Sequence, residues 1–181
     1  IAGRKDMLVV NAGIGGNQIA GPRQADTGSW RGGPAALDRL DRDVLSLSGV
    51  KTVVWLEGIN DFSDNGRSSA AQVLEACQEA VARLRAAGIR VIGATVPSAL
   101  GSTREGHGGV WQDEQRQLFN AALRNSKPFD ALVDLDAVLT DPATGALRQP
   151  FNGDSTIGAP GDGVHPNRAG HARMAQAILN A

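Results

Sequence analysis

The sequence predicts an α/β protein with a parallel β-sheet that is covered by helices on both faces. Short continuous apolar runs, which are typical of buried parallel strands, alternate with segments of about 10–20 residues that have helical apolar spacing. The run at residues 7–10 ends in a glycine cluster and the run at 89–96 ends at Pro97, where connecting loops begin. The composition is ordinary for a globular protein, and 181 residues are enough for a hydrophobic core, so residues 1–181 are predicted to form a single domain.

The first half of the chain is predicted to hold two strands and two helices. Residues 7–10 are an apolar run before a glycine cluster and are predicted to form a buried strand. After a glycine-rich loop at residues 21–33, a helix is expected from Pro34 to Gly49, followed by a strand at residues 50–56. Ser68 or Ser69 can cap the next helix, which Gly88 ends. Its apolar stripe is Val73, Cys77, Val81 and Leu84.

The second half continues the alternation. Strands are predicted at residues 89–96 and 131–135, with a glycine- and serine-rich loop at 98–109 and a helix from Trp111 between them. A long irregular loop at residues 141–161 precedes the last helix, which starts at Pro166. The apolar residues expected on the buried side of that helix are Met174, Ala175, Ile178 and Leu179. Loops that follow parallel strands meet at the carboxyl edge of the sheet, where open α/β folds place their sites.

Charge and composition exclude several classes of partner. The net charge of −1 gives no electrostatic reason to expect nucleic acid or an anionic membrane as a partner. No apolar run approaches the length of a membrane span. The single cysteine, Cys77, cannot form a disulfide within the chain, and its place on a helical stripe predicts a small buried core residue.

Residues 161–167, with the sequence Gly-Asp-Gly-Val-His-Pro-Asn, contain the first candidate site. Asp162 and His165 lie three residues apart at the start of the last helix. A carboxylate can fix the tautomer of an imidazole, which then takes a proton from a hydroxyl nucleophile. An Asp that caps the helix beside a surface His is the alternative interpretation of these residues alone.

Two further motifs each follow a predicted strand. Residues 11–17, Asn-Ala-Gly-Ile-Gly-Gly-Asn, form a glycine loop whose backbone N–H groups can approach an oxyanion. A dinucleotide-binding loop is disfavoured because Gln18 occupies the last glycine position of that pattern and no acidic ribose partner follows. In the second motif, residues 58–61, the amide of Asn60 is a neutral donor for the same oxyanion, whereas Asp61 is expected to brace the loop.

In order and spacing, these three motifs resemble blocks two, three and five of the SGNH hydrolases, the GDSL-type esterases and lipases. The resemblance runs from Met7 to the end of the chain, and its strongest part is His165-Pro166-Asn167 with Ala169-Gly170-His171. It implies a three-layer α/β/α, flavodoxin-like parallel sheet with the strand order 2-1-3-4-5. It also implies that His165 is the general base, Asp162 its orienting partner, and Gly16 and Asn60 the oxyanion donors, without a cofactor.

The first block of this family, a central strand ending in Gly-Asp-Ser with the nucleophilic serine, would precede residue 1. We therefore expect a missing N-terminal segment, or a second chain, to supply the central strand and the serine. Gly153-Asp154-Ser155 spells the same tripeptide, but it follows no buried strand, so Ser155 is expected to be a loop residue outside hydrogen-bond reach of His165.

A metal site is disfavoured by the small number of ligands. The only histidines are His107, His165 and His171, and the last two are six apart on the predicted helix, so they point away from each other. His107 is expected near the cleft mouth, where it can contact substrate.

The resemblance implies a serine esterase that cleaves small-molecule carboxylic esters through an acyl-enzyme. Open glycine-rich loops suit short acyl groups, such as acetyl esters of sugars, or aryl esters. The alternative from another class is a catalytically silent relative that binds an ester or carbohydrate without cleaving it.

Overall fold

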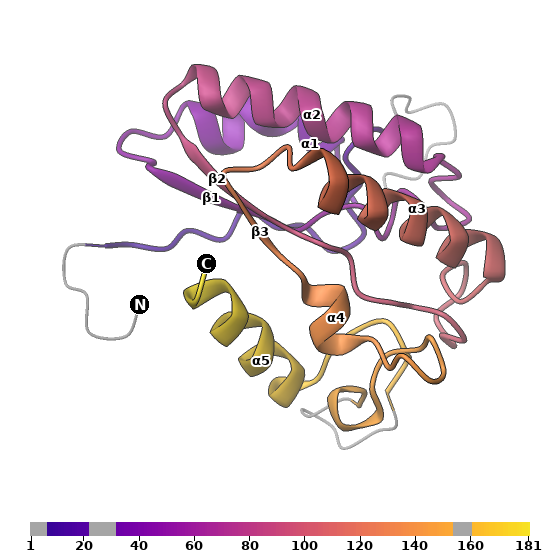
Figure 1. The fold of residues 1–181 in the computed structure, drawn as a ribbon. Coiled ribbons are helices and arrows are strands. Elements are labelled where there is room, and N and C mark those ends of the chain that lie inside the picture. Colours follow the sequence, from indigo (N-terminus) through magenta and orange to yellow (C-terminus); the bar gives the residue numbers. More distant parts are fainter. Residues whose placement is uncertain (1–6, 22–31, 154–160) are drawn as a thin grey trace.

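The computed structural model describes residues 7–21, 32–153 and 161–181 (Figure 1). Its sheet has three parallel strands in the order β1 (Thr52–Trp55), β2 (Arg90–Ala94) and β3 (Ala131–Val133). In the register of the sheet, Val53 lies opposite Val91, and Ile92 lies opposite Ala131. The predicted α/β fold with a parallel sheet is confirmed.

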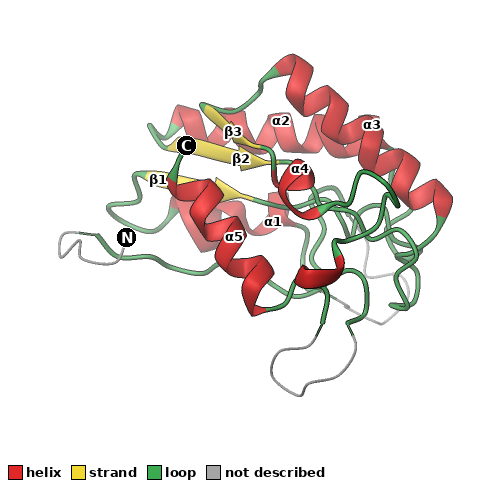
Figure 2. Cartoon of the chain, turned by 60° about the horizontal axis from the view of Figure 1, so that its bottom comes forward, coloured by secondary structure: helices red, strands yellow, loops and turns green. Residues whose placement is uncertain are grey.

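Helices cover both faces of this sheet and make the fold three-layered. On one face lie α1 (Ala36–Leu40), α2 (Ala70–Ala86) and α3 (Val110–Ser126), and on the other lies α5 (Arg168–Leu179) (Figures 1 and 2). The π-helical turn η1 (Asp41–Leu45) extends α1, while α4 (Leu135–Leu139) and the 3-10 turn η2 (Gln149–Phe151) connect β3 to α5. None of the helices in these described ranges is long and apolar enough to cross a membrane.

The larger core lies between the sheet and α2, as the apolar stripe of that helix predicts. All six core-facing residues of α2 are buried, and Cys77 is among them with no exposed surface. Burial raises the pKa of the Cys77 thiol to about 12, so the thiol stays protonated and acts as a core residue. Ser69 is the N-cap, and with Gln72 it completes a capping box.

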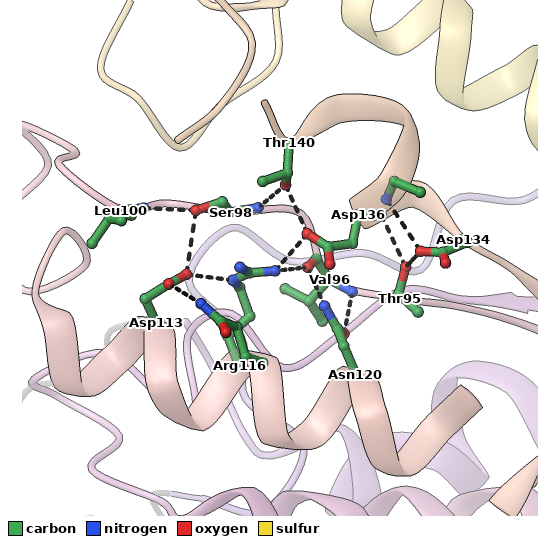
Figure 3. A network of polar contacts seen from close by, with 12 residues as sticks. Thr95, Val96, Ser98, Leu100, Asp113, Arg116, Asn120, Asp134, Asp136 and Thr140 are labelled. Carbon is green, nitrogen blue, oxygen red and sulfur yellow. Dashed lines mark hydrogen bonds and ion pairs between the residues drawn. The ribbon is translucent and has the colours of Figure 1, made fainter. Parts of the chain in front are cut away.

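A buried polar network ties α3 to the loop that leaves β2, as Figure 3 shows. Arg116 is buried and donates to Asp113 at 2.8 Å, to Asp136 at 2.6 Å and to the carbonyl of Val96 at 3.0 Å. Asn120 donates to that same carbonyl and accepts from the Val96 N–H, both at 2.8 Å. Because a buried charge needs several partners, this network fixes the base of the 97–109 loop.

The predicted strand at residues 7–10 is wrong. These residues have no strand conformation, and Leu8 is 97% exposed while Val9 is 69% exposed. An apolar segment holds a strand conformation only when a neighbouring strand satisfies its backbone N–H and C=O groups. In the described part of the chain, no strand lies beside it.

Two smaller differences have local causes. β3 stops at Val133 because Asp134 caps α4, accepting a hydrogen bond from the N–H of Ala137. In α5, Met174 and Ile178 are half-buried against the sheet, as predicted, but Ala175 is exposed and Leu179 is 56% exposed. The apolar side of α5 is thus only partly covered.

The sheet has an open edge at β1 (Figure 2). β2 is the one strand that pairs with β1 in the described residues, and Val54 on β1 is 48% exposed. An exposed apolar edge is a ready template for another strand.

Candidate active site

Four loops form the candidate site, and two of them leave the carboxyl ends of β1 and β2. They are residues 11–20, residues 57–66 after β1, residues 97–109 after β2, and residues 161–167 before α5. Hydrogen bonds link them. The 97–109 loop contacts the 161–167 turn at one point and the 57–66 loop at another, and the 57–66 loop contacts the 11–20 loop through Asn60. The predicted gathering of the three motifs at one edge of the sheet is therefore what the structure shows.

Asp162 and His165 form a hydrogen-bonded pair. His165 Nδ1 lies 2.6 Å from Asp162 Oδ2, and the backbone N–H of His165 donates to Asp162 Oδ1 at 2.9 Å. The tight turn that makes this possible contains Gly163, whose φ of +80° suits glycine. Because the carboxylate occupies Nδ1, the other ring nitrogen, Nε2, is left to act as a base. Nε2 has no hydrogen-bond partner in the described ranges, and the ring is 70% exposed.

The charge of Asp162 is stabilised by this same turn. Burial alone raises the pKa of the carboxyl, but the hydrogen bonds from the backbone and side chain of His165 and from the backbone of Val164 outweigh burial and lower it to about 2. Asp162 is therefore ionised at any pH at which an esterase works. An ionised partner favours the imidazolium that forms during proton transfer.

The 97–109 loop and Asn152, the residue after η2, hold the turn in place. Ser102 Oγ donates to the carbonyl of Asp162 at 2.5 Å, and the N–H of Thr103 donates to the same oxygen at 2.9 Å. On the other side, Asn152 accepts from the N–H of Gly163 at 3.1 Å. The cap of α5 is Asn167, which accepts from the N–H of Gly170, and not Asp162. This removes the interpretation of Asp162 as a simple helix cap.

Asn60 is held at both ends of its amide. Its Nδ2 donates to the backbone carbonyl of Asn17 at 2.9 Å, and its Oδ1 lies 3.1 Å from Nε2 of His107. A carbonyl can only accept, so the contact with Asn17 fixes which end of the amide carries the N–H₂ group. One of the two N–H bonds is used there, and the second is available as an oxyanion donor.

Gly16 lies at a tight turn of the 11–20 loop with φ at +82°. Its backbone N–H has no hydrogen-bond partner in residues 7–21, 32–153 and 161–181, and the residue is exposed. Gly32 packs so closely on this turn that a Cβ on Gly32 would lie 2.1 Å from the carbonyl oxygen of Gly16. The N–H of Gly16 is thus available to an oxyanion.

Sequence reasoning missed the residue that anchors this loop, Asn17. Its side chain is buried, donates to the carbonyls of Gly32 and Pro34 at 2.6 and 2.7 Å, and accepts two hydrogen bonds from Arg39. Nothing in the sequence marks an Asn after a glycine cluster as a buried structural centre. Arg39 also donates to the carbonyl of Ala12. It is buried on α1 beside Leu40, and nothing in the spacing of the sequence links it to this loop.

Asp61, which is expected to brace its own loop at residues 58–61, has its side chain bonded to the 11–20 loop. It is fully buried, and its carboxylate accepts from the backbone N–H groups of Ile19 and Ala20 at 3.0 Å. Burial raises the pKa of Asp61 to about 6, although the hydrogen bonds from Ala20 and Ile19 lower it. The carboxylate is bonded to the backbone of the 11–20 loop, and its role is therefore structural.

Glu57, two residues after the end of β1, is a second acid beside this loop that sequence analysis did not single out. Its carboxylate lies 3.7 Å from Arg39. Burial raises the pKa of Glu57 to about 7; the charge of Arg39 opposes this shift and that of Asp61 adds to it. The folded protein therefore holds the Glu57 proton to higher pH than the unfolded chain, whose Glu ionises near 4.5.

This shift predicts that Glu57→Gln stabilises the protein at high pH. Glu57 contributes stability below about pH 4.5 that is lost as the pH rises through about 7, because ionisation then costs more in the folded state. Gln cannot ionise, so the free energy of unfolding at pH 8 should rise by roughly 1–3 kcal/mol and change little at pH 4. Urea unfolding at both pH values measures this, with the exposed Glu75→Gln as control. An equal effect of Glu57→Gln at both pH values would contradict it.

The remaining candidate residues lie as follows. His107 is half-buried in the 97–109 loop and contacts Asn60, while its contact with substrate stays a prediction. Ser155 lies outside the described residues, as do residues 22–31 of the predicted glycine-rich loop. In the described ranges, no group of three or more His, Cys, Asp or Glu side chains could hold a metal ion.

Comparison with solved structures shows the same fold in several esterases. A GDSL-like lipase from Bacteroides thetaiotaomicron is 23% identical, with a TM-score of 0.59 over 80% of this chain and 69% of that one. A carbohydrate acetylesterase from Sinorhizobium meliloti is 14% identical, with a TM-score of 0.62 over 91% and 73%. An acetyl xylan esterase is 20% identical, with a TM-score of 0.62 over 93% and 78%. At these identities the likeness shows a shared fold.

The family assignment comes from the sequence itself. No curated protein matches this chain. Residues 1–173, however, match the model of the GDSL-like lipase/acylhydrolase family. This match covers every motif of the candidate site, from the glycine loop to His165. The chain therefore belongs to the GDSL-like lipase/acylhydrolase family and is a carboxylic ester hydrolase of that type.

Proposed function

We propose that the protein is a serine esterase that works through an acyl-enzyme. The observation that carries the proposal is the 2.6 Å contact between His165 Nδ1 and Asp162 Oδ2, which leaves Nε2 unpartnered in the described residues. Nε2 takes the proton of a serine hydroxyl while the serine oxygen bonds to the ester carbonyl carbon. The N–H groups of Asn60 and Gly16 stabilise the resulting oxyanion.

The second half of the reaction uses the same groups. When the tetrahedral intermediate collapses, the bond to the alcohol oxygen breaks, and protonated His165 gives its proton to the leaving alcohol. A water molecule then loses a proton to His165 and attacks the acyl carbon. The bond from that carbon to the serine oxygen breaks, His165 returns the proton to the serine oxygen, and the carboxylic acid leaves. Asp162 remains a carboxylate throughout and holds the ring in place.

We infer that the serine belongs to a strand that docks on the open edge of β1. Three observations support this inference: the half-exposed Val54 on β1, the exposed apolar residues 8–10, and the partly uncovered apolar side of α5. A strand paired with β1 would cover these surfaces and end at the carboxyl edge of the sheet, beside His165 and Asn60. An N-terminal segment of the same protein or a second chain can supply it.

The substrates that we propose are esters with short acyl groups, such as acetyl esters of sugars. Two proteins with the same fold are named for carbohydrate acetyl and acetyl xylan esters. The described contacts of Asn60, His107 and Asn17, are polar, and so is Ser102 beside Asp162. Polar side chains of this kind suit a sugar ester better than a long acyl chain.

The test is hydrolysis of p-nitrophenyl esters of increasing acyl length by the protein expressed from its complete coding sequence. We expect kcat/KM to fall by about tenfold or more from acetate to octanoate, because a long apolar chain would stay in water. Acetylated xylan oligosaccharides should be deacetylated as well. A preference for octanoate would contradict the short-acyl assignment. Binding of these sugars without any hydrolysis would favour the alternative, a silent relative that binds its ligand uncleaved.

A further inference from the structure

We propose that His107 is a positioning residue for ester hydrolysis, which holds the amide of Asn60 so that its free N–H faces the oxyanion. The inference rests on the proposed function of Asn60. Nε2 of His107 lies 3.1 Å from Oδ1 of Asn60, and Nδ2 of Asn60 lies 2.9 Å from the carbonyl of Asn17. The amide oxygen is therefore bonded to the 97–109 loop, and the amide nitrogen is bonded to the 11–20 loop.

The direction of the His107 bond follows from its partners. The contact with Asn17 requires the nitrogen of the Asn60 amide on that side, so the atom that faces His107 is oxygen and can only accept. Nε2 of His107 must therefore carry the hydrogen. Nδ1 lies 3.0 Å from the carbonyl of Glu105, which is also an acceptor, so the ring makes both contacts when both nitrogens carry a hydrogen. A neutral ring keeps the bond to Asn60 in the tautomer protonated at Nε2.

This bond acts on the amide in two ways. It prevents rotation of the Asn60 side chain, because rotation would turn the N–H₂ group toward the ring and the oxygen toward the acceptor of Asn17. A hydrogen bond to the amide oxygen also polarises the amide, which makes its N–H groups stronger hydrogen-bond donors. A preorganised and polarised donor stabilises an oxyanion more than one that must reorient during the reaction.

The position of His107 is fixed by the loop that carries it. The N–H of Asp64 donates to the carbonyl of Gly106 at 2.9 Å, which ties the loop to its neighbour. Within the loop, the N–H of His107 donates to the carbonyl of Arg104 at 3.2 Å, and the N–H of Gly101 donates to the carbonyl of Gly108 at 3.0 Å. The base of the loop is bound to α3 by the network around Arg116 (Figure 3). The loop therefore presents the ring at a set place beside Asn60.

The same loop reaches the other half of the site. Its Ser102 and Thr103 donate to the carbonyl of Asp162, so one segment orients both the acid–base pair and the oxyanion donor. Because one loop holds both groups, the distance and orientation between the base and the oxyanion donor stay constant. A variant of His107 should disturb the donor alone, because the contacts of Ser102 do not involve the ring.

The experiment compares three variants of the complete protein with p-nitrophenyl acetate as substrate. His107→Ala should lower kcat by about tenfold with little change in KM, because a group that acts in the transition state affects kcat. His107→Gln can place an N–H near the position of Nε2 and should recover kcat to within about threefold of wild type. His171→Ala, an exposed histidine on α5, is the matched control and should leave kcat unchanged. Equal loss in the Ala and Gln variants, or a change in KM alone, would overturn the proposal.

Two further measurements separate this proposal from the proposed function. In an Asn60→Ala background, His107→Ala should change kcat by less than about twofold, because its target is gone; a full tenfold loss there would overturn the role through Asn60. The second measurement needs no activity. Nitrogen-15 NMR of the His107 ring should show a hydrogen on Nε2, and a coupling across the hydrogen bond should identify Asn60 as its acceptor. An unprotonated Nε2 would overturn the proposal. If the wild-type protein hydrolyses no ester, the proposed function fails while the NMR result still decides the His107 bond.

Discussion

His165→Ala is expected to lower kcat/KM for ester hydrolysis by about 10³-fold or more while the fold is kept. The general base is lost, and without it the serine hydroxyl is a weak nucleophile. The effect on folding should be small because the ring is 70% exposed and, within the described residues, its side chain bonds to Asp162 alone. Steady-state hydrolysis of p-nitrophenyl acetate measures the loss, and thermal unfolding measures the fold.

His171→Ala is the control for this variant too, since it removes an exposed histidine from the helix that follows the turn. Asp162→Asn tests the pair from its other side: the amide cannot favour the imidazolium, so kcat should fall by roughly 10²-fold or more. Because Asp162 has a pKa of about 2, an acid limb of the rate profile above pH 4 must come from another group. A His165→Ala rate close to that of wild type would contradict the assignment of the base.

Asn60→Ala is expected to reduce kcat by about 10²-fold with little change in KM. The oxyanion exists only in the transition state and the tetrahedral intermediate, so loss of its donor leaves ground-state binding intact. Asn60 also bonds the carbonyl of Asn17, and removal of that contact should lower the free energy of unfolding by about 1 kcal/mol. Kinetics and urea unfolding of the same preparation separate the two effects.

Asn180→Ala, at the exposed end of α5, is the matched control for Asn60. It should change neither kcat nor KM. If Asn60→Ala instead raised KM at constant kcat, Asn60 would belong to substrate binding and the oxyanion would depend on Gly16 alone.

The fold could largely be predicted from local patterns. The stripe of α2 and the strands at β1 and β2 depend on apolar spacing within one segment, and the sequence contains that spacing directly. The strand expected at residues 7–10 is wrong for a physical reason that no local pattern includes. Whether an apolar run becomes a strand depends on a neighbour that supplies hydrogen bonds, and the described residues provide none there.

The candidate site could be predicted in part. Asp162 and His165 are close in sequence, so their pairing follows from a short turn, and the structure confirms the contact. The hydrogen bonds that hold the site residues in place join distant parts of the sequence. His107 and Asn60 are 47 residues apart, and Ser102 and Asp162 are 60 residues apart. Pairings between loops depend on how the sheet places their ends, so residue types and spacing alone could not indicate them.

We propose that Asp162 and His165 activate a serine carried by a strand at the open edge of β1. Fluorophosphonate labelling of the complete protein, followed by peptide mapping with mass spectrometry, tests this claim most directly, because the reagent bonds to an activated serine. We predict one adduct per protein, on a serine outside residues 1–181, and its loss in His165→Ala. An adduct on Ser155, or labelling that persists in His165→Ala, would contradict the claim.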